Sequence, residues 1–223
     1  MATFVLVPGA GTGPGYWHLL IDELRARGHD AIAVDLPCDD DSAGLSAYAD
    51  VAIHATTGRT DLIVVAHSFG GFTGPLVCSR SPVRRLVLLT AMVPSPGETP
   101  AEWWGNTGYE EARREQAERL GIDDDVITTF FHDVPPDLAA EAMRDARDQS
   151  ATPMTESWPL DAWPDVHTTF LLCRDDRFLP AGFMRRVVRE RLGITPDEMD
   201  AGHHPMLARP KELADRLDAY TRD

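Results

Sequence analysis

Short apolar runs recur along the chain and are separated by stretches with helical periodicity. Strands are predicted for the runs at residues 3–7, 31–34, 62–66, 85–90, 168–173 and about 194–199. Helices are predicted at residues 16–27, 45–53, 72–78, 183–192 and 210–220. Nearly continuous apolar strands that alternate with helices are typical of a parallel sheet covered on both faces. The pattern therefore predicts an α/β fold with a mostly parallel, doubly wound sheet of about six strands.

The alternation is interrupted between about residues 94 and 165. This segment has little strand pattern, is rich in Trp and Pro, and predicts helices at 109–120, 123–131 and 137–149. We predict a core of residues 1–93 and 166–223, with residues 94–165 inserted between the fourth and fifth strands as a helical cap. The cap is expected over the carboxyl edge of the sheet, where ligands bind in such folds. Its aromatic residues are expected to form partly an apolar ceiling and partly the cap's own core; they are Trp103, Trp104, Phe130 and Phe131.

Charge and cysteine content narrow the range of partners. The 223 residues carry a formal net charge of −15, which argues against nucleic acids and anionic membranes as partners. Cys38, Cys78 and Cys173 form no C-x-x-C pair and no metal-binding spacing. We expect free thiols in a reducing, cytoplasmic setting, with the last two in the core. The N-terminus has no signal-peptide pattern, and no apolar run is long enough to span a membrane.

One motif at the end of the third predicted strand carries candidate chemistry. The strand ends in Ala66-His67-Ser68-Phe69-Gly70, and a predicted helix follows. A serine between small residues at such a turn is typical of a nucleophile elbow, which exposes the hydroxyl above the sheet edge. The other Ser-x-Gly sites, at residues 42–44 and 95–97, follow no predicted strand. The alternative interpretation is a strand–helix turn with an idle serine.

A serine nucleophile needs a base, a group that orients the base, and donors for an oxyanion. Two aspartates at residues 175–176 follow the fifth predicted strand, and two histidines at residues 203–204 follow the sixth. The chain order Ser, Asp, His is that of the α/β-hydrolase architecture. The glycine-rich loop at residues 8–15 follows the first strand and can offer one backbone N–H, with Phe69 offering the other. These arguments leave both aspartates and both histidines open.

Several motifs together resemble a known family. They are Val7-Pro8-Gly9-Ala10, Val34-Asp35-Leu36-Pro37, Ala66-His67-Ser68-Phe69-Gly70-Gly71, Cys173-Arg174-Asp175-Asp176-Arg177-Phe178-Leu179-Pro180 and Gly202-His203-His204-Pro205-Met206-Leu207. Over nearly its whole length the chain resembles the α/β-hydrolase superfamily. Within it, the chain is similar to the small capped group of plant methyl esterases, salicylate-binding esterases and hydroxynitrile lyases, with their bacterial relatives.

The resemblance implies a role for each candidate. It implies Ser68 as the nucleophile, Asp176 as the orienting acid and His203 as the base. It implies that the backbone N–H groups of Ala10 and Phe69 form the oxyanion hole. The family positions favour the second aspartate of the 175–176 pair and the first histidine of the 203–204 pair. A substrate pocket is expected to be lined by Gly9, Gly11, Trp17, His67, Trp103, Trp104, Phe131, Phe178 and His204.

Two departures from the family bear on the reaction. Many relatives have His-Gly where this chain has Pro8-Gly9, so the bracing of the oxyanion loop is expected to differ. Lyases of the group carry a threonine in place of Gly9 and a lysine in place of His204, and the lysine stabilises departing cyanide. His67 is a poor candidate for the base, because neighbouring side chains on an elbow diverge. The resemblance therefore favours an esterase over a lyase.

The sequence thus predicts a serine hydrolase that cleaves a small, largely apolar carboxylic ester through an acyl-enzyme intermediate. No cofactor or metal is expected, because the G-x-G-x-x-G spacing, the phosphate-loop lysine and H-E-x-x-H are all absent. A small-molecule ester is the expected partner, and a homodimer is left open. The alternatives are a hydroxynitrile-lyase-like, thioesterase or cyclase step in a biosynthetic pathway, and a non-catalytic receptor that uses the same pocket.

Overall fold

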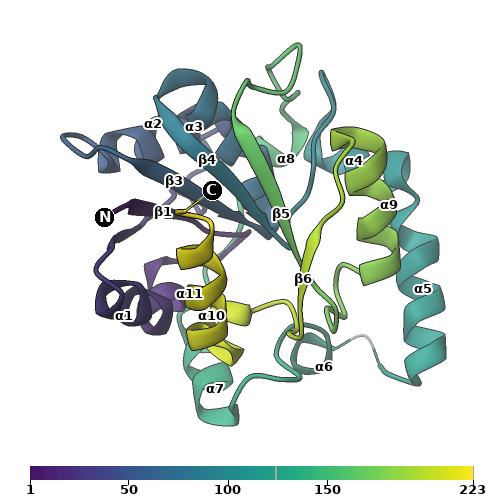
Figure 1. The fold of residues 1–223 in the computed structure, drawn as a ribbon. Coiled ribbons are helices and arrows are strands. Elements are labelled where there is room, and N and C mark those ends of the chain that lie inside the picture. Colours follow the sequence, from purple (N-terminus) through teal and green to yellow (C-terminus); the bar gives the residue numbers. More distant parts are fainter. Residues whose placement is uncertain (124, 223) are drawn as a thin grey trace.

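Six parallel strands form one sheet in the order β2-β1-β3-β4-β5-β6 in the computed structural model, which describes residues 1–123 and 125–222 (Figure 1). The strands are β1 Thr3–Val7, β2 Asp30–Ala33, β3 Leu62–His67, β4 Val83–Leu89, β5 His167–Cys173 and β6 Asp197–Met199. All six strand predictions are confirmed, with differences of one or two residues at the ends of four of them. The sixth is shorter than expected, because Pro196 has no N–H to contribute to the ladder.

The carboxyl ends of the central strands are level with one another. Val7 of β1 pairs with Ala66 of β3, and His67 of β3 pairs with Leu89 of β4. Leu89 in turn pairs with Leu171 of β5. Because the strands are parallel and in this register, the loops that follow them emerge at one edge of the sheet.

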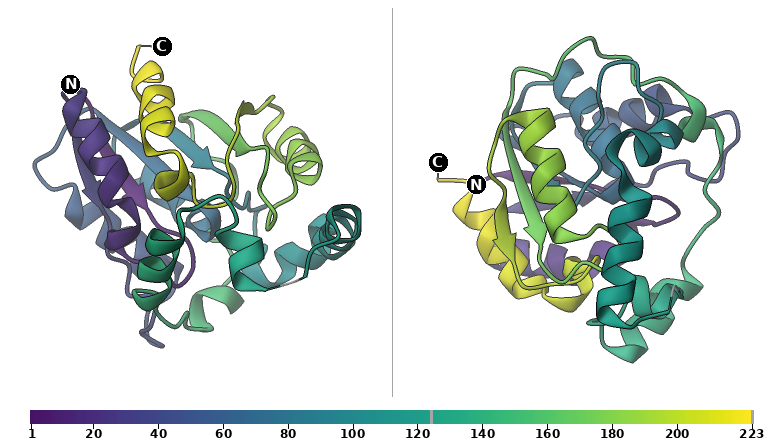
Figure 2. Two further views of the ribbon diagram at one scale, coloured as in Figure 1. Left: turned by 90° about the horizontal axis from the view of Figure 1, so that it is seen from below. Right: turned by 90° about the vertical axis from the view of Figure 1, so that its right-hand side faces the viewer.

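Helices cover both faces of the sheet (Figures 1 and 2). Helices α1 (His18–Ala26) and α11 (Pro210–Ala219) pack side by side on one face. Helices α2 (Leu45–Ala55), α3 (Gly74–Arg80) and α9 (Ala181–Leu192) lie on the other. Neighbouring strand residues alternate between the two cores, so that Phe4 packs with the first pair and Val5 with the second group. Both cores are apolar, and this explains the nearly continuous apolar strands.

Two predicted helices begin differently from the expectation. Residues 14–27 divide into a 3-10 turn, η1 (Pro14–Trp17), and α1. The helix after the serine motif begins as a 3-10 turn, η2 (Ser68–Phe72), before α3. The short helix α10 (Pro205–Ala208) precedes α11. These tight turns lie where the chain leaves the carboxyl edge of the sheet.

The insert between β4 and β5 contains only helices and loops within its described residues. Its helices are α4 (Pro100–Thr107), α5 (Tyr109–Leu120), α6 (Val126–Phe130), α7 (Pro136–Arg144) and α8 (Thr152–Thr155). Figure 1 shows α6 and α7 beyond the carboxyl ends of the strands, whereas α4 and α5 lie beside α9. The predicted helix at 137–149 ends early, because Arg147 and Gln149 instead bond to the loop that follows β1. The middle of the insert therefore covers the edge, and the boundaries 94 and 165 stay a prediction.

Within the described part of the chain, no helix has both the length and the apolar character needed to cross a membrane. All three cysteines are free. Cys173 is buried as expected, but Cys38 is also buried and Cys78 is only half-buried. The expectation that Cys78 lies in the core therefore needs correction: it lies towards the end of α3, against the core but not enclosed by it.

Candidate active site

Ser68 occupies a strained turn between β3 and η2. Its φ angle is +51°, in the left-handed region that a non-glycine residue rarely adopts. A Cβ atom at Gly71 would overlap the carbonyl oxygen of Met92, and a Cβ atom at Gly74 would lie 2.7 Å from the Cβ atom of Ala66. Small residues are therefore required where the strand and the following helix cross. This geometry is that of a nucleophile elbow.

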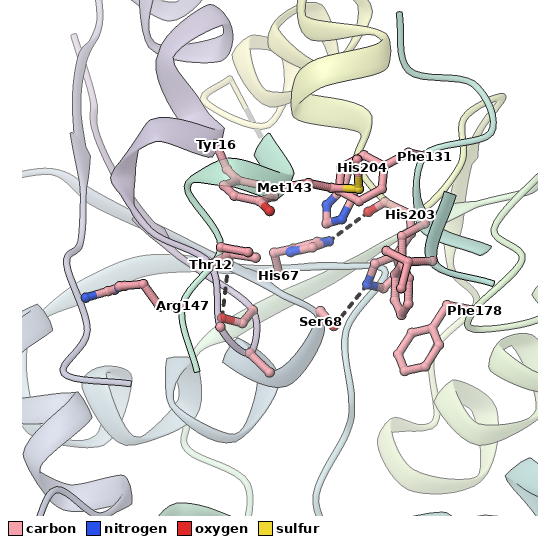
Figure 3. Close-up of a pocket in the computed structure, with 16 residues that line it drawn as sticks. Thr12, Tyr16, His67, Ser68, Phe131, Met143, Arg147, Phe178, His203 and His204 are labelled. Carbon is pink, nitrogen blue, oxygen red and sulfur yellow. Dashed lines mark hydrogen bonds between the residues drawn. The ribbon is translucent and has the colours of Figure 1, made fainter. Parts of the chain in front are cut away.

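The structure brings Ser68, His203 and Asp176 together from three loops at the carboxyl edge. The Nε2 atom of His203 lies 3.0 Å from the Ser68 Oγ atom (Figure 3). The Nδ1 atom of the same ring lies 2.8 Å from Oδ2 of Asp176. The exposed fractions of Ser68, His203 and Asp176 are 7%, 2% and 0%. A hydroxyl, an imidazole and a carboxylate in this order can pass a proton from the serine to the histidine.

Asp176 is fixed by more than the histidine. Its Oδ1 atom accepts the backbone N–H groups of Phe178 (2.8 Å) and Leu179 (2.9 Å), and its Oδ2 atom accepts the hydroxyl of Thr90 (2.6 Å). Burial by itself raises the pKa of Asp176, but His203, Thr90 and the Leu179 amide all favour the carboxylate and hold the pKa below its ordinary value. The carboxylate is therefore charged and held in one orientation.

Sequence reasoning missed two partners of this aspartate. Thr90 directly follows β4, the strand next to the one that ends before Asp176, and its φ angle of +39° marks a second strained position. Gln116 of α5 donates its amide to the main-chain oxygen of Asp176 at 2.9 Å. A polar residue at the end of a neighbouring parallel strand was a readable signal for Thr90. Nothing in the local pattern indicated Gln116.

Asp175 and His67 adjoin the predicted triad residues in sequence but take no part in the triad. Asp175 is exposed, and its contacts with the core are through the main chain, to Ala201 and His132. The ring of His67 is buried, and its Nε2 atom donates to the main-chain oxygen of His203 at 2.8 Å. Burial, reinforced by the charge of His203, lowers the pKa of His67 to about 3. His67 is thus a neutral bracing group for the histidine loop.

The glycine-rich loop after β1 lies directly against the serine. A Cβ atom at Gly9 would be 3.0 Å from the Cβ atom of Ser68 and 3.5 Å from its hydroxyl. The hydroxyl of Thr12 donates to the Gly9 carbonyl at 3.1 Å (Figure 3). Ala10, the candidate oxyanion donor, is the next residue along this loop and lines the same cavity. A side chain at position 9 would press on the nucleophile, so glycine there lets the loop approach Ser68 closely.

The insert braces this loop in a way that the sequence did not reveal. The backbone N–H of Gly11 donates to the side-chain oxygen of Gln149 at 3.2 Å, and the N–H of Arg147 donates to the Gly11 carbonyl at 2.9 Å. The amide of Gln149 is itself held by the hydroxyl of Tyr48 at 3.0 Å. These bonds hold the loop in a chain that has Pro8 where many relatives have histidine.

A cavity of about 490 Å³ opens above the serine. Its lining residues are Gly9, Ala10, Gly11, Thr12, Tyr16, His67, Ser68, Val126, Phe130, Phe131, Met143, Ala146, Arg147, Phe178, His203 and His204. Six of the nine predicted pocket residues are therefore in the lining. The sequence missed Val126 and Met143, which lie on α6 and α7, because helical periodicity does not show which face meets a cavity. The wall is predominantly apolar and aromatic.

Three predicted pocket residues do not line this cavity. Trp17 is buried against the ring of His67, behind the cavity. Trp103 is fully buried, and its indole N–H donates to the Val93 carbonyl at 2.9 Å. Trp104 is half-buried and packs against Trp103 and Phe178. The expectation of a tryptophan ceiling is wrong, because α4 packs against the core beside α9.

No group of three or more His, Cys, Asp or Glu side chains that could hold a metal ion occurs among the described residues. The site is therefore built from a serine, a histidine, a carboxylate and two backbone segments.

The chain matches the Alpha/beta hydrolase family over residues 4–216. It belongs to this family. The match agrees with the fold and with the elbow geometry described above, and it confirms the α/β-hydrolase prediction.

The relatives of this α/β hydrolase include plant enzymes. Methylesterase 7 of Arabidopsis thaliana is 26% identical, over 94% of this chain and 92% of its own length. Norfluorocurarine synthase 1 of Strychnos sp. is 22% identical, over 94% of this chain and 91% of its own length. The predicted resemblance to the plant methyl esterase group is thereby confirmed.

Solved structures show the same fold. An extracellular α/β-hydrolase from a Paenibacillus species, described as sharing homology with tobacco salicylic acid binding protein 2, superimposes with a TM-score of 0.82 at 21% identity and covers 100% of both chains. Polyneuridine aldehyde esterase superimposes with a TM-score of 0.82 at 18% identity and covers 99% of both chains. At this level of identity the likeness concerns the fold.

Proposed function

We propose that this α/β hydrolase is a serine esterase that cleaves a small, largely apolar carboxylic ester. The observation that carries the proposal is the unbroken line from Ser68 Oγ through His203 to Asp176 Oδ2, with contacts of 3.0 and 2.8 Å, at the floor of an apolar cavity. Binding alone does not need an activated serine, so the arrangement favours an enzyme over a receptor. Relatives named as methylesterases support the ester class.

The proposed reaction has two halves. In the first, His203 Nε2 takes the Ser68 proton while Oγ attacks the ester carbonyl carbon, and the backbone N–H groups of Ala10 and Phe69 stabilise the resulting oxyanion. His203 then gives the proton to the leaving alcohol oxygen, which yields the free alcohol and an acyl-Ser68 ester. In the second half, His203 takes a proton from water, the hydroxide attacks the acyl group, and Oγ leaves with the proton. The products are a carboxylic acid and an alcohol.

The contribution of Asp176 is to hold His203 in the tautomer that has its proton on Nδ1. With that proton directed at the carboxylate, Nε2 is left as an acceptor for the serine hydroxyl. The same carboxylate stabilises the imidazolium that forms when the proton moves. The buried contacts with Thr90 and two backbone amides keep the carboxylate in place throughout.

Two features of the structure favour ester hydrolysis over cyanohydrin cleavage. Gly9 offers a substrate no side-chain hydroxyl, whereas lyases carry a threonine there, and a Cβ atom at this position would lie 3.0 Å from that of Ser68 and press on the nucleophile. Burial lowers the pKa of His204 well below its ordinary value, and repulsion from a protonated His203 or His67 would lower it further. A neutral His204 does not supply the cation that a departing cyanide needs.

The free cysteines bear on the cellular compartment of the enzyme. The three cysteines are free, and two of them are buried. Because nothing in the fold depends on a disulfide, we place the enzyme in a reducing, cytoplasmic compartment.

The proposal is tested with p-nitrophenyl and methyl esters of increasing acyl length. We expect turnover by the wild type and a loss of about 10⁴-fold or more in Ser68→Ala. Ser42→Ala is the matched control, because this exposed serine also precedes an x-Gly pair but donates its hydroxyl to Asp40 and not to a histidine. A fluorophosphonate probe should label Ser68 alone, as read by mass spectrometry. Turnover that survives in a folded Ser68→Ala variant would refute the mechanism, and ligand binding without turnover in the wild type would support a receptor.

A further inference from the structure

His204 has a buried ring nitrogen to which nothing in the described structure bonds. The residue is 5% exposed, and its Nδ1 atom has no hydrogen-bond partner among residues 1–123 and 125–222. Leaving a buried polar atom unpaired destabilises the folded state, and native proteins keep few such atoms. An unpaired nitrogen beside a substrate cavity points to a partner that arrives with the substrate.

The ring lies in the cavity wall close to the reacting groups. Its centroid is 5.2 Å from that of His203, 4.8 Å from that of Phe131 and 5.4 Å from that of Tyr16. Figure 3 shows His204 between the labelled residues Tyr16 and Phe131, across the cavity from Ser68. His204 and Ser68 line the same cavity, so one small substrate can contact both.

Other polar side chains of the lining already have partners. The Tyr16 hydroxyl donates to a main-chain oxygen of α7 at 2.9 Å, and the Thr12 hydroxyl donates to its own loop at 3.1 Å. The ring of His67 bonds to the main chain of the histidine loop at 2.8 Å. Arg147 bonds to Asp35 at 3.0 Å. Among the lining side chains in the described residues, His204 is the one with a fully buried side-chain nitrogen that has no hydrogen-bond partner.

The charge state of His204 limits what it can bind. Burial lowers its pKa well below the ordinary value, and repulsion from a protonated His203 or His67 would lower it further, so the imidazole is neutral at working pH. A neutral imidazole has one N–H donor and one acceptor nitrogen. A hydroxyl group can both donate and accept, so it suits either tautomer. A carboxylate or ammonium group would lose its hydration against the apolar wall, and the neutral imidazole would not offer it an opposite charge.

We propose that His204 is a substrate-binding residue that hydrogen-bonds a hydroxyl group near the reacting ester carbonyl, so that the enzyme prefers hydroxy esters to their alkyl counterparts. The inference rests on the esterase function proposed above, and it names the substrate class. The aromatic wall holds the carbon skeleton, and the imidazole selects for one polar substituent.

The test uses two pairs of esters that differ by a hydroxyl in place of a methyl group. The acyl pair is p-nitrophenyl 3-hydroxyoctanoate and p-nitrophenyl 3-methyloctanoate. The alcohol pair is 2-hydroxypropyl octanoate and isobutyl octanoate. The two pairs place the hydroxyl on either side of the scissile bond, and within each pair the two esters have nearly the same size. The measured quantity is the ratio of kcat/KM within each pair.

Two variants separate hydrogen bonding from packing. His204→Phe keeps a ring against Phe131 but cannot hydrogen-bond, whereas His204→Gln keeps a donor and an acceptor. In at least one pair we expect the wild type to favour the hydroxy ester by about tenfold. The preference should disappear in His204→Phe and persist in His204→Gln, and the ratio within each pair is the readout because either variant can change the absolute rates.

The outcomes separate this inference from the esterase function itself. If Ser68-dependent hydrolysis occurs but the wild type shows no hydroxyl preference in either pair, the role of His204 is overturned while the esterase stands. The same holds if His204→Phe slows both members of each pair equally. If Ser68→Ala hydrolyses the esters as well as the wild type does, the esterase proposal fails. The preference of the wild type and the behaviour of His204→Gln decide the question even if His204→Phe does not fold.

Discussion

Replacing Asp176 by asparagine should place the proton of His203 on the wrong nitrogen. The Oδ1 atom of Asp176 accepts two backbone N–H groups, from Phe178 and Leu179. In Asp176→Asn these two donors require the amide oxygen at that position, so the amide NH₂ takes the place of Oδ2. The NH₂ group then faces the hydroxyl of Thr90 and Nδ1 of His203, which lie 2.6 and 2.8 Å from Oδ2 in the wild type. Because the amide donates, Nδ1 must become an acceptor.

The size of the effect follows from this tautomer. A histidine with an acceptor at Nδ1 carries its proton on Nε2, so it cannot take the proton of Ser68. The carboxylate that would stabilise the imidazolium is also gone. In a well-studied triad the same change lowers kcat by about 10⁴-fold, which corresponds to about 5 kcal/mol at ~1.36 kcal/mol per factor of ten. KM should change little, because the wall of the cavity is untouched.

The assay is steady-state hydrolysis of a p-nitrophenyl ester, with Tm measured for each protein. Asp175→Asn is the matched control, since this neighbouring carboxylate is exposed and does not contact the histidine; its kcat should stay close to that of the wild type. A folded Asp176→Asn that keeps more than about a tenth of kcat would refute the orientation argument. So would a larger loss in Asp175→Asn than in Asp176→Asn.

Three further predictions concern the elbow, the oxyanion loop and pH. Gly71→Ala should fold poorly, because its Cβ atom would overlap a main-chain carbonyl, whereas Gly182→Ala meets no atom within 4 Å and should leave Tm near or above that of the wild type. Gln149→Leu removes the acceptor for the backbone N–H of Gly11 and should lower kcat about tenfold at similar KM, with partial recovery in Gln149→Glu. The pKa of His67 is about 3 in the folded state and about 6.5 in the unfolded chain. Between these two pH values the unfolded chain binds a proton at His67 and the folded chain does not. As pH falls from about 6.5 towards 3, urea unfolding should show a loss of up to about 1.4 kcal/mol per pH unit in the wild type beyond that in His67→Gln.

The sheet and the triad could be predicted from sequence because each rests on a local pattern. Strands buried on both faces are nearly continuous apolar runs, and parallel strands place their following loops at one edge. A serine between Ala66 and Gly70, an aspartate after the fifth strand and a histidine after the sixth therefore had to approach one another. The choice of Asp176 over Asp175 came from the family motif, and the structure brings Asp176 rather than Asp175 to the histidine.

The rest could not be predicted, because it depends on contacts between distant segments. The sequence indicated that Trp103 and Trp104 lie in the insert, but it did not show that Trp103 packs against Phe183 of α9 and that Trp104 packs against Trp103 and Phe178. Val126 and Met143 gave no signal beyond helical periodicity, and they line the wall. The unpaired nitrogen of His204 is visible only when every neighbouring group has been placed.

The insert does more than cover the cavity, because it bonds to three of the segments that carry the site. Gln149 accepts the N–H of Gly11 in the oxyanion loop at 3.2 Å, and Gln116 donates to the main chain of Asp176 at 2.9 Å. Asp133 accepts the N–H of Gly202, the residue before the catalytic histidine, at 2.7 Å. Each bond reaches a main-chain atom, so each fixes the position of a loop regardless of the side chains on it. Changes in the insert should therefore alter kcat as well as substrate range, since the segment that shapes the pocket also holds the catalytic loops in register.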